Sequence, residues 1–302
     1  MSAQDANRDL IGAPGGRWKL ATPALVIDLD ALERNIAKMA EHARAQHIAL
    51  RPHAKTHKCS EIARRQIAAC ALGICTAKLG EAEALADAGI DSILITSPIV
   101  TEGGIARALA LNARLRELRI VCDDAEIATK LDEAARAAGQ RLRVVVDIDP
   151  GMGRTGIRPD DGATALVEQV AKSTHLEYAG LQCYAGHLQH LESPNERRDK
   201  SLAAMKELAA FRDQLASRKL APGLVSGGGT GTFDIDPDAR TLTELQVGSY
   251  VFMDRQYNDV WEKPGDKPPF ETSLFVQTTI ISVHRDGLAT SDAGLKAFAT
   301  DA

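Results

Sequence analysis

The stretch Leu50–Lys58, with the sequence LRPHAKTHK, carries the residue types with the most direct chemistry in this chain. If it is a strand that runs into a loop, the two-residue period places Arg51, His53 and Lys55 on one face. A lysine on the inner face of a strand is costly unless it is neutral, paired or used covalently. Because burial and neighbouring cations such as Arg51 and His53 lower the pKa of an amine, Lys55 is a candidate for Schiff-base chemistry. The alternative is that Lys55 and Lys58 are ordinary solvated loop cations.

The hydrophobic pattern of the chain predicts parallel strands, which would form the scaffold that positions this lysine. Short apolar strands alternate with helices, as expected for parallel strands joined by crossover helices. Eight strands in about 200 residues are the right number to close a (β/α)8 TIM barrel, so the predicted fold class is α/β. A doubly wound open sheet is the alternative, but no GxGxxG follows the first strand. The predicted barrel strands span 48–53, 73–77, 92–96, 118–122, 143–148, 178–184, 223–226 and 245–250.

Three parts are predicted along the chain. Residues 1–22 form a polar N-terminal arm, residues 23–255 the barrel domain, and residues 256–302 a linker and the start of a C-terminal β domain. Ala24–Ile27 has the apolar pattern of a buried strand. Since the β-rich segment that begins at Ser273 stops before enough strands exist to close a sheet, we expect this last domain to be partial.

Composition excludes several classes of function. With 302 residues, 44% of them apolar, the chain can bury a large core. The net charge of −5 disfavours nucleic acid as a partner, and no apolar run approaches a membrane span. The polar N-terminus is unlike a signal peptide, so a cytoplasmic protein is expected. Five scattered cysteines without a CxxC pair indicate free thiols rather than disulfides or a zinc site.

A glycine-rich turn, Ser226–Gly231, ends the seventh predicted strand. Successive glycines let the backbone turn tightly and present N–H groups to an anion, and the loops after strands seven and eight of a barrel are the usual phosphate site. A bare flexible loop is the alternative. The turn therefore predicts a phosphate site only through its place in the barrel.

Three further polar clusters follow other predicted strands. In Asp149–Gly156 (DPGMGRTG), glycines on both sides free the backbone to hold Arg154 over the barrel mouth, where it could bind a phenolate or carboxylate oxygen; a surface arginine is the alternative. Tyr184–His187 and Gln246–Tyr250 end the sixth and eighth strands. Each is more often structural when taken alone. Four polar clusters at four strand ends favour a site at the common rim.

At this point the sequence resembles a known family. The segments 51–58 (RPHAKTHK), 73–78 (GICTAK), 228–232 (GGTGT) and 243–254 (TELQVGSYVFMD) resemble the D-threonine aldolase family, which also holds D-serine dehydratases and 3-hydroxy-D-aspartate aldolases. This family belongs to the alanine-racemase-like class of pyridoxal-phosphate enzymes. The resemblance covers about residues 20–300 and implies a barrel of the alanine racemase type with pyridoxal 5′-phosphate as cofactor.

The resemblance also implies roles for individual residues. Lys55 would form the Schiff base with the cofactor, and Arg154 would contact its phenolic oxygen. Gln246 matches the position from which other members reach the pyridine nitrogen. Tyr184 and His187 would line the ring and substrate, and His53 would be placed for proton transfer. The phosphate would be held by two turns that contain Gly228, Gly229, Thr230, Gly248, Ser249 and Tyr250.

The implied reaction is the cleavage of D-3-hydroxy amino acids to glycine and an aldehyde. Dehydration of D-serine or 3-hydroxy-D-aspartate is the alternative within the family, and a non-catalytic pyridoxal-phosphate-binding protein is the alternative outside it. Family members are similar in using a divalent metal (Mn, Mg or Zn) held by a C-terminal histidine with an aspartate or cysteine. No such pair is found in this sequence, in which His284 is isolated. The expected partners are a small D-hydroxy amino acid and a second copy of the chain, as a homodimer.

Overall fold

The computed structural model of the protein describes residues 6–261 and 268–298. The chain divides into two compact units. One unit combines the residues up to Glu33 with those from Glu271 onward, and the other is Arg34–Phe270. None of the helices in these described ranges is long and apolar enough to cross a membrane.

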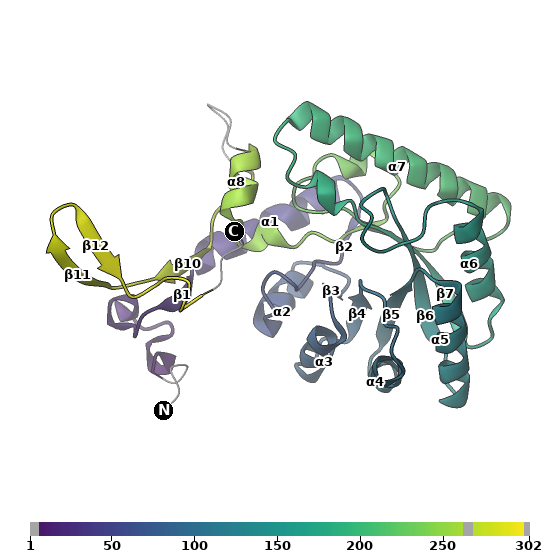
Figure 1. The fold of residues 1–302 in the computed structure, drawn as a ribbon, viewed down its shortest axis with the longest axis horizontal. Coiled ribbons are helices and arrows are strands. Elements are labelled where there is room, and N and C mark those ends of the chain that lie inside the picture. The colour runs from purple at the N-terminus through teal and green to yellow at the C-terminus, as the bar shows by residue number, and fades with distance from the viewer. Residues whose placement is uncertain (1–5, 262–267, 299–302) are drawn as a thin grey trace. The chain divides into compact units, whose positions relative to one another are not determined.

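Eight parallel strands of the larger unit form one curved sheet in the order β2-β9-β8-β7-β6-β5-β4-β3 (Figure 1). The end strands β2 and β3 meet through a parallel bridge between His53 and Cys75, and the Cys75 N–H donates to the Pro52 carbonyl at 2.8 Å. The strands therefore close into a ring, which an open sheet would not do. The strands are β2 (Ala49–Leu50), β3 (Ile74–Thr76), β4 (Ser92–Ile95), β5 (Glu117–Cys122), β6 (Leu142–Ile148), β7 (Leu176–Cys183), β8 (Val225–Gly227) and β9 (Glu244–Leu245).

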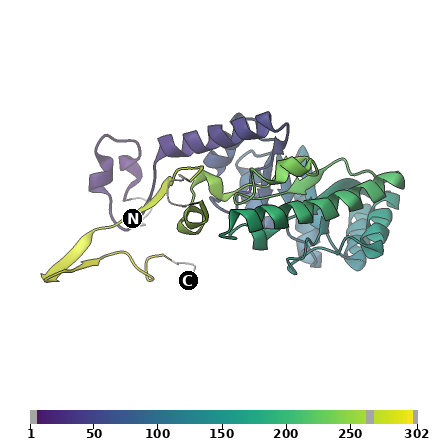
Figure 2. The same ribbon diagram turned by 90° about the horizontal axis from the view of Figure 1, so that it is seen from above.

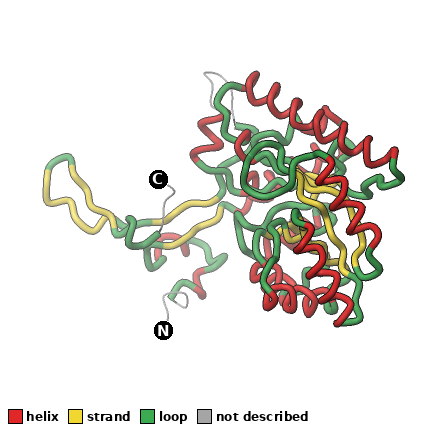
Figure 3. Tube along the Cα trace, turned by 45° about the vertical axis from the view of Figure 1, so that its right-hand side comes forward, coloured by secondary structure: helices red, strands yellow, loops and turns green. Residues whose placement is uncertain are grey.

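The predicted barrel is thus confirmed, and each of its eight predicted strands overlaps an observed one. Helices lie outside the strands, as Figure 3 shows in red and yellow, and the long helix α7 runs along the outer side of the barrel (Figure 2). Five short 3-10 helices complete the elements: η1 (Arg8–Leu10), η2 (Gly16–Lys19), η3 (Gly186–Leu188), η4 (Asp236–Ala239) and η5 (Ser249–Val251). The α-helices are α1 (Leu29–Ala45), α2 (Ser60–Ala68), α3 (Leu79–Asp87), α4 (Glu102–Asn112), α5 (Ala125–Ala137), α6 (Asp161–Lys172), α7 (Pro194–Ser217) and α8 (Arg255–Trp261).

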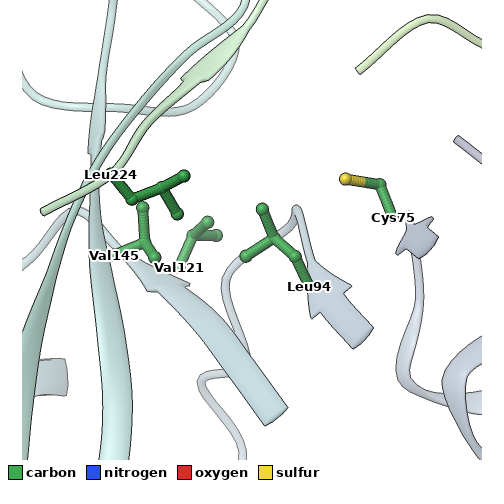
Figure 4. Packing of buried hydrophobic residues seen from close by; sticks show 5 residues of the cluster. All are labelled: Cys75, Leu94, Val121, Val145 and Leu224. Carbon is green, nitrogen blue, oxygen red and sulfur yellow. The ribbon is translucent and has the colours of Figure 1, made fainter. Parts of the chain in front are cut away.

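A hydrophobic cluster packs inside the barrel. Its side chains come from four neighbouring strands and the residue before β8 (Figure 4). All are buried, since β-branched and leucine side chains from successive strands interdigitate there. The three buried cysteines belong to the core, and all five cysteines are free, as predicted. The cluster consists of Cys75, Leu94, Val121, Val145 and Leu224.

The barrel also contains a buried ionic group centred on Arg51, which is 1% exposed. Its Nε donates to Glu244 at 3.0 Å, one terminal nitrogen donates to Ser92 at 2.9 Å, and the other reaches Glu117 at 3.4 Å. The prediction that Arg51 acts on Lys55 is therefore wrong, because its charge is compensated by two carboxylates within the barrel.

Gly180 in β7 permits the close approach of a neighbouring backbone. Its φ is +146°, and a Cβ there would collide with the carbonyl oxygen of Leu224. We expect Gly180→Ala to lower the free energy of unfolding by at least about 2 kcal/mol, since both the backbone conformation and the contact are unfavourable for alanine. Urea denaturation measures this effect. The matched control is Gly80→Ala in α3, where nothing lies within 4 Å of the added methyl group; it should stabilise the protein by up to about 1 kcal/mol. Equal effects of the two changes would contradict the argument.

The smaller unit contains two antiparallel strand pairs. β1 (Ala24–Ile27) pairs with β10 (Leu274–Gln277), and β11 (Ile280–Arg285) pairs with β12 (Leu288–Ser291). The prediction of a buried strand at Ala24–Ile27 is wrong in one respect: the strand exists but Leu25 is 72% exposed. A pair of strands without a second layer leaves one face uncovered, which the local apolar pattern does not reveal. The β-rich pattern after Ser273 is confirmed by β10, β11 and β12.

Candidate active site

Lys55 lies just beyond β2, at the carboxyl end of the barrel strands. The residue is exposed along part of its length, but its Nζ lies 4.9 Å from the centroid of the Tyr184 ring. Burial of the amine lowers the pKa of Lys55, and the nearby guanidinium of Arg154 lowers it further. The cation that acts on Lys55 therefore comes from the loop after β6. A lysine with a lowered pKa has a larger neutral, nucleophilic fraction at neutral pH.

The amine belongs to a cavity of about 90 Å³ at the barrel mouth. Its lining brings together five residues predicted from sequence and four that were not. Sequence reasoning gave these four no role, although one of them, Ala77, belongs to the segment 73–78 that carries the resemblance. The lining consists of His53, Lys55, Ala77, Thr96, Ser97, Arg154, Gln182, Tyr184 and Gln246.

The ring of His53 is held by bonds at both nitrogens. Nδ1 accepts from the Lys55 backbone N–H at 3.2 Å, and Nε2 lies 3.0 Å from the Thr96 hydroxyl. Because that hydroxyl donates to the Thr76 carbonyl at 3.0 Å, it accepts from His53. Burial, and next the charge of Lys55, lowers the pKa of His53 well below its usual range. The imidazole is therefore neutral and oriented, so proton transfer by His53 would require one of these bonds to break.

Arg154 is presented by a tightly turned loop after β6. The Asp149 carboxylate accepts from the N–H groups of Gly151 and Met152 at 2.9 and 2.7 Å. At the other end the Gly156 N–H donates to the Asp123 carboxylate at 2.8 Å. The Arg154 guanidinium lies 5.3 Å from the Tyr184 ring centroid.

The Tyr184 ring therefore has both cations near it. Burial raises the pKa of its phenol, which stays neutral. A flat neutral ring beside an amine and a guanidinium can support a planar, electron-poor ligand.

Two glycine-rich turns border the same region. The Tyr250 N–H donates to the Thr230 hydroxyl at 3.1 Å, which joins the turn after β8 to the turn after β9. A Cβ on Gly248 would lie 3.1 Å from the His53 carbonyl, so the second turn is adjacent to the lysine segment. A Cβ on Gly229 would collide with Gln189, whose amide accepts from the Gly231 N–H at 2.9 Å. Only glycine permits this close approach.

The turns expose backbone donors. Within residues 6–261 and 268–298, the N–H groups of Gly229, Thr230 and Gly248 make no hydrogen bond, although these residues are buried. Buried N–H groups rarely lack a partner, so these donors fit an anionic group such as a phosphate. The side chain of Tyr250 does not take part, because its phenol accepts from Gln66 at 3.1 Å. Ser249 lies between them at the start of η5.

Two predicted residues differ in their placement. Gln246 is 4% exposed and lies in the cavity lining. His187, in contrast, is an exposed residue of η3 and lies outside that lining. The local sequence placed both at strand ends, but His187 lies in the 3-10 turn that follows β7, where it is exposed.

The family of the chain follows from its match to a known sequence model. Residues 27–256 match the alanine racemase N-terminal domain, which is most of the chain. The chain belongs to this family. The match spans all eight barrel strands and every predicted cofactor-binding residue.

Several known proteins are similar to the chain over most of its length. It is 35% identical over 306 residues to the 3-hydroxy-D-aspartate aldolase of Paracoccus denitrificans (strain Pd 1222), covering 100% of this chain and 79% of that protein. It is 31% identical to the D-threo-3-hydroxyaspartate dehydratase of Delftia sp. (strain HT23), covering 93% of this chain and 73% of that one. The crystal structure of D-threonine aldolase from Filomicrobium marinum has a TM-score of 0.87 and 40% identity, covering 92% of this chain and 74% of the other.

The resemblance implies a divalent metal in the family, but the sequence of this chain offered no pair of ligands for it. In the part of the chain that the structure describes, no group of three or more His, Cys, Asp or Glu side chains is arranged to hold a metal ion. His284 bonds to the hydroxyl of Ser282 at 2.7 Å.

Two buried carboxyls predict how stability depends on pH. Burial raises the pKa of Asp147 and of Asp236 to about 6 each. Since an unfolded aspartate has a pKa near 3.9, the folded state binds more protons between about pH 4 and 6, and stability falls as pH rises through this window by about 2–3 kcal/mol per group. In the variant Asp147→Asn, the side-chain oxygen can still accept the hydrogen bond from Gln182. Urea denaturation should therefore show Asp147→Asn gaining about 2–3 kcal/mol relative to the unmodified protein between pH 4 and 7; a constant difference would contradict the assignment.

Proposed function

We propose that the protein is a pyridoxal-phosphate-dependent lyase that cleaves D-3-hydroxy amino acids to glycine and an aldehyde. One observation carries this proposal: the Lys55 amine lies 4.9 Å from the Tyr184 ring at the barrel-mouth cavity, and Gly248, whose N–H has no partner among the described residues, lies against the backbone of His53 in the segment that carries this lysine. These are the groups that would bind, respectively, the aldehyde, the ring and the phosphate of this cofactor. The names of the relatives support the same class of reaction.

Each residue has a defined task in this proposal. Lys55 would hold the aldehyde of the cofactor covalently, and its lowered pKa leaves the free amine neutral and able to accept a proton. Arg154 would bind the phenolic oxygen, and Tyr184 would support the ring. His53 acts as a positioning residue, since its ring bonds the Lys55 backbone. The phosphate is held by the turns that contain Gly228, Gly229, Thr230, Gly248, Ser249 and Tyr250.

When bound, the cofactor supplies an electron-poor ring that takes up the negative charge left on Cα. Removal of the β-hydroxyl proton breaks the Cα–Cβ bond, the oxygen forms the aldehyde, and the electron pair stays on Cα, which is then protonated to give glycine. His187 is exposed and lies outside the cavity lining, so its role at the substrate stays a prediction from the resemblance alone. The divalent metal of the family and the homodimer remain predictions, which an EDTA titration and light scattering would test.

The reconstituted protein should show an absorption band above 400 nm with pyridoxal phosphate. Borohydride reduction should then attach the cofactor to the peptide that contains Lys55. Attachment elsewhere, or no band, would overturn the proposal.

Product analysis separates the remaining alternatives. Aldehyde and glycine from D-threonine or 3-hydroxy-D-aspartate identify the aldolase, whereas ammonia and a keto acid identify a dehydratase, which the Delftia relative favours. Cofactor binding without either product would identify a non-catalytic binding protein. The assays should be run with and without Mn²⁺.

A further inference from the structure

One buried glutamine packs against the glycine turn that follows β8. Gln189 comes directly after η3, and the residue is 1% exposed. A Cβ on Gly229 would collide with the side-chain amide of Gln189, and a Cβ on Gly231 would collide with its backbone carbonyl. The turn and the glutamine are therefore packed at a distance that glycine permits and a larger residue would not. Gln189 does not line the cavity at Lys55, so it acts on that region only through the turn.

The hydrogen bonds of Gln189 fix the direction in which its amide faces. Nε2 donates to the Ala185 carbonyl at 3.2 Å, and Oε1 accepts from the Gly231 N–H at 2.9 Å. A backbone carbonyl can only accept and a backbone N–H can only donate, so each of these partners determines the orientation by itself. A rotated amide would face both of them with the wrong atom.

The second hydrogen of this amide leads to a buried carboxyl group. Gln189 Nε2 also donates to the Thr232 hydroxyl at 3.1 Å, and that hydroxyl donates to Asp236 at 2.6 Å. Asp236 is 2% exposed and accepts a further hydrogen bond from the hydroxyl of Ser201 in α7. The amide is thus held by a chain of hydrogen bonds that ends on a long helix, and both of its hydrogens are used.

These bonds decide which N–H groups of the turn remain available to a ligand. The Gly231 N–H is used by Gln189, and the Thr232 N–H donates to the Gly229 carbonyl at 3.2 Å. Among the residues that the structure describes, the N–H groups of Gly229 and Thr230 have no acceptor. Gln189 therefore holds the turn in a form in which two consecutive donors are free, and consecutive free N–H groups are what binds an anion.

The same amide also binds the residue next to Tyr184. Ala185, whose carbonyl accepts from Gln189, directly follows Tyr184 at the point where the chain leaves β7. Tyr184 is the residue whose ring lies 4.9 Å from the Lys55 amine. Gln189 thus joins the segment that carries this ring to the turn that carries the free N–H groups, and a single side chain sets the spacing between them.

We propose that Gln189 is a positioning residue that orders the turn at Gly229 and Thr230 and fixes its spacing from Tyr184, and that it thereby sets the preference of the protein for phosphorylated over unphosphorylated pyridoxal. This inference rests on the proposed function, which places the phosphate at the glycine turns. Without Gln189 the Gly231 N–H loses its acceptor, and the glycines of the turn regain the conformational freedom that glycine has more than any other residue. Binding of the phosphate would then have to order the turn, which costs affinity.

The test compares pyridoxal phosphate with pyridoxal, which lacks the phosphate. Each is titrated into the full chain, and binding is followed by the absorption band above 400 nm. Gln189→Met keeps the length of the side chain but removes its hydrogen bonds. It should weaken the binding of pyridoxal phosphate roughly 10- to 100-fold, as expected for one or two lost buried hydrogen bonds, and that of pyridoxal by less than about threefold. A role in general stability alone would weaken both ligands by the same factor.

Three further variants serve as rescue and control. Thr232→Val removes the hydroxyl that accepts from Gln189, so it should show the same selective loss to a smaller extent, and Thr232→Ser should restore the preference because it keeps the hydroxyl. Gln169→Met in α6 is the matched control, since that amide donates to Ala125 and Thr129 away from the turn. It should leave the ratio of the two affinities unchanged. Near-ultraviolet circular dichroism verifies that each variant is folded.

The outcomes separate this inference from the proposed function. If the Schiff base forms at Lys55 but Gln189→Met weakens both ligands by one factor, or weakens neither, the inference is overturned while the lyase proposal stands. Should Gln189→Met not fold, Thr232→Val decides by the same ratio. If no Schiff base forms at Lys55 in the unmodified protein, both fail.

Discussion

Replacing Lys55 with alanine should abolish the absorption band above 400 nm and reduce turnover by at least about a thousandfold. The physical reason is that the amine at this position lines the barrel-mouth cavity and lies 4.9 Å from the Tyr184 ring, where the proposal places the aldehyde of the cofactor. Without it the cofactor can bind only by its phosphate and ring contacts. Loss of a covalent catalytic group typically costs several orders of magnitude in rate. Visible absorption spectra and an aldehyde assay measure the two effects.

Two controls make this experiment specific. Lys55→Arg retains the positive charge but cannot form the Schiff base, so it should lose the band as alanine does. Lys172→Ala, on the outer surface of α6 and paired with Glu168, should retain both band and turnover. A Lys55→Ala protein with an unchanged spectrum would exclude the covalent role.

Replacing Glu244 with alanine should lower the free energy of unfolding by about 3–5 kcal/mol, because it leaves the buried charge of Arg51 without its nearest partner. Arg51 is 1% exposed and its second carboxylate, Glu117, is at the longer distance of 3.4 Å. The change would also remove the acceptor of the Ser226 hydroxyl, which itself accepts from the Gln246 amide at 2.9 Å. Denaturant titration followed by circular dichroism measures the change.

An exposed ion pair is the matched control for this change. Glu61 pairs with Arg64 at 3.1 Å on the surface of α2, and both side chains are at least half exposed. Glu61→Ala should cost less than about 1 kcal/mol. The double change Arg51→Met with Glu244→Leu should recover part of the loss, since it removes both buried charges. If Glu244→Ala cost no more than Glu61→Ala, Arg51 would not depend on this pairing.

Local patterns in the sequence determined the strands and the glycine turns. The alternation of short apolar runs with helices predicted the barrel, because both periodicities are set by backbone geometry within a few residues. The segment around Lys55 and the turn at Gly228 could be read in the same way, since a cation on a strand face and a run of glycines are costly unless the structure uses them. The sequence thus predicted five of the nine residues that line the cavity.

Tertiary structure alone decided which polar groups meet. Arg51 and Glu244 are far apart in sequence, and only closure of the barrel brings them together and separates Arg51 from Lys55. The same holds for Gln182, which no motif distinguishes, and Gln246, since their hydrogen bond joins residues 64 positions apart in the chain. Exposure of β1 and of His187 also depends on the neighbours of each segment. Hydrogen bonding and burial are properties of pairs of distant residues, so the chemistry of the site was settled by packing rather than by local pattern.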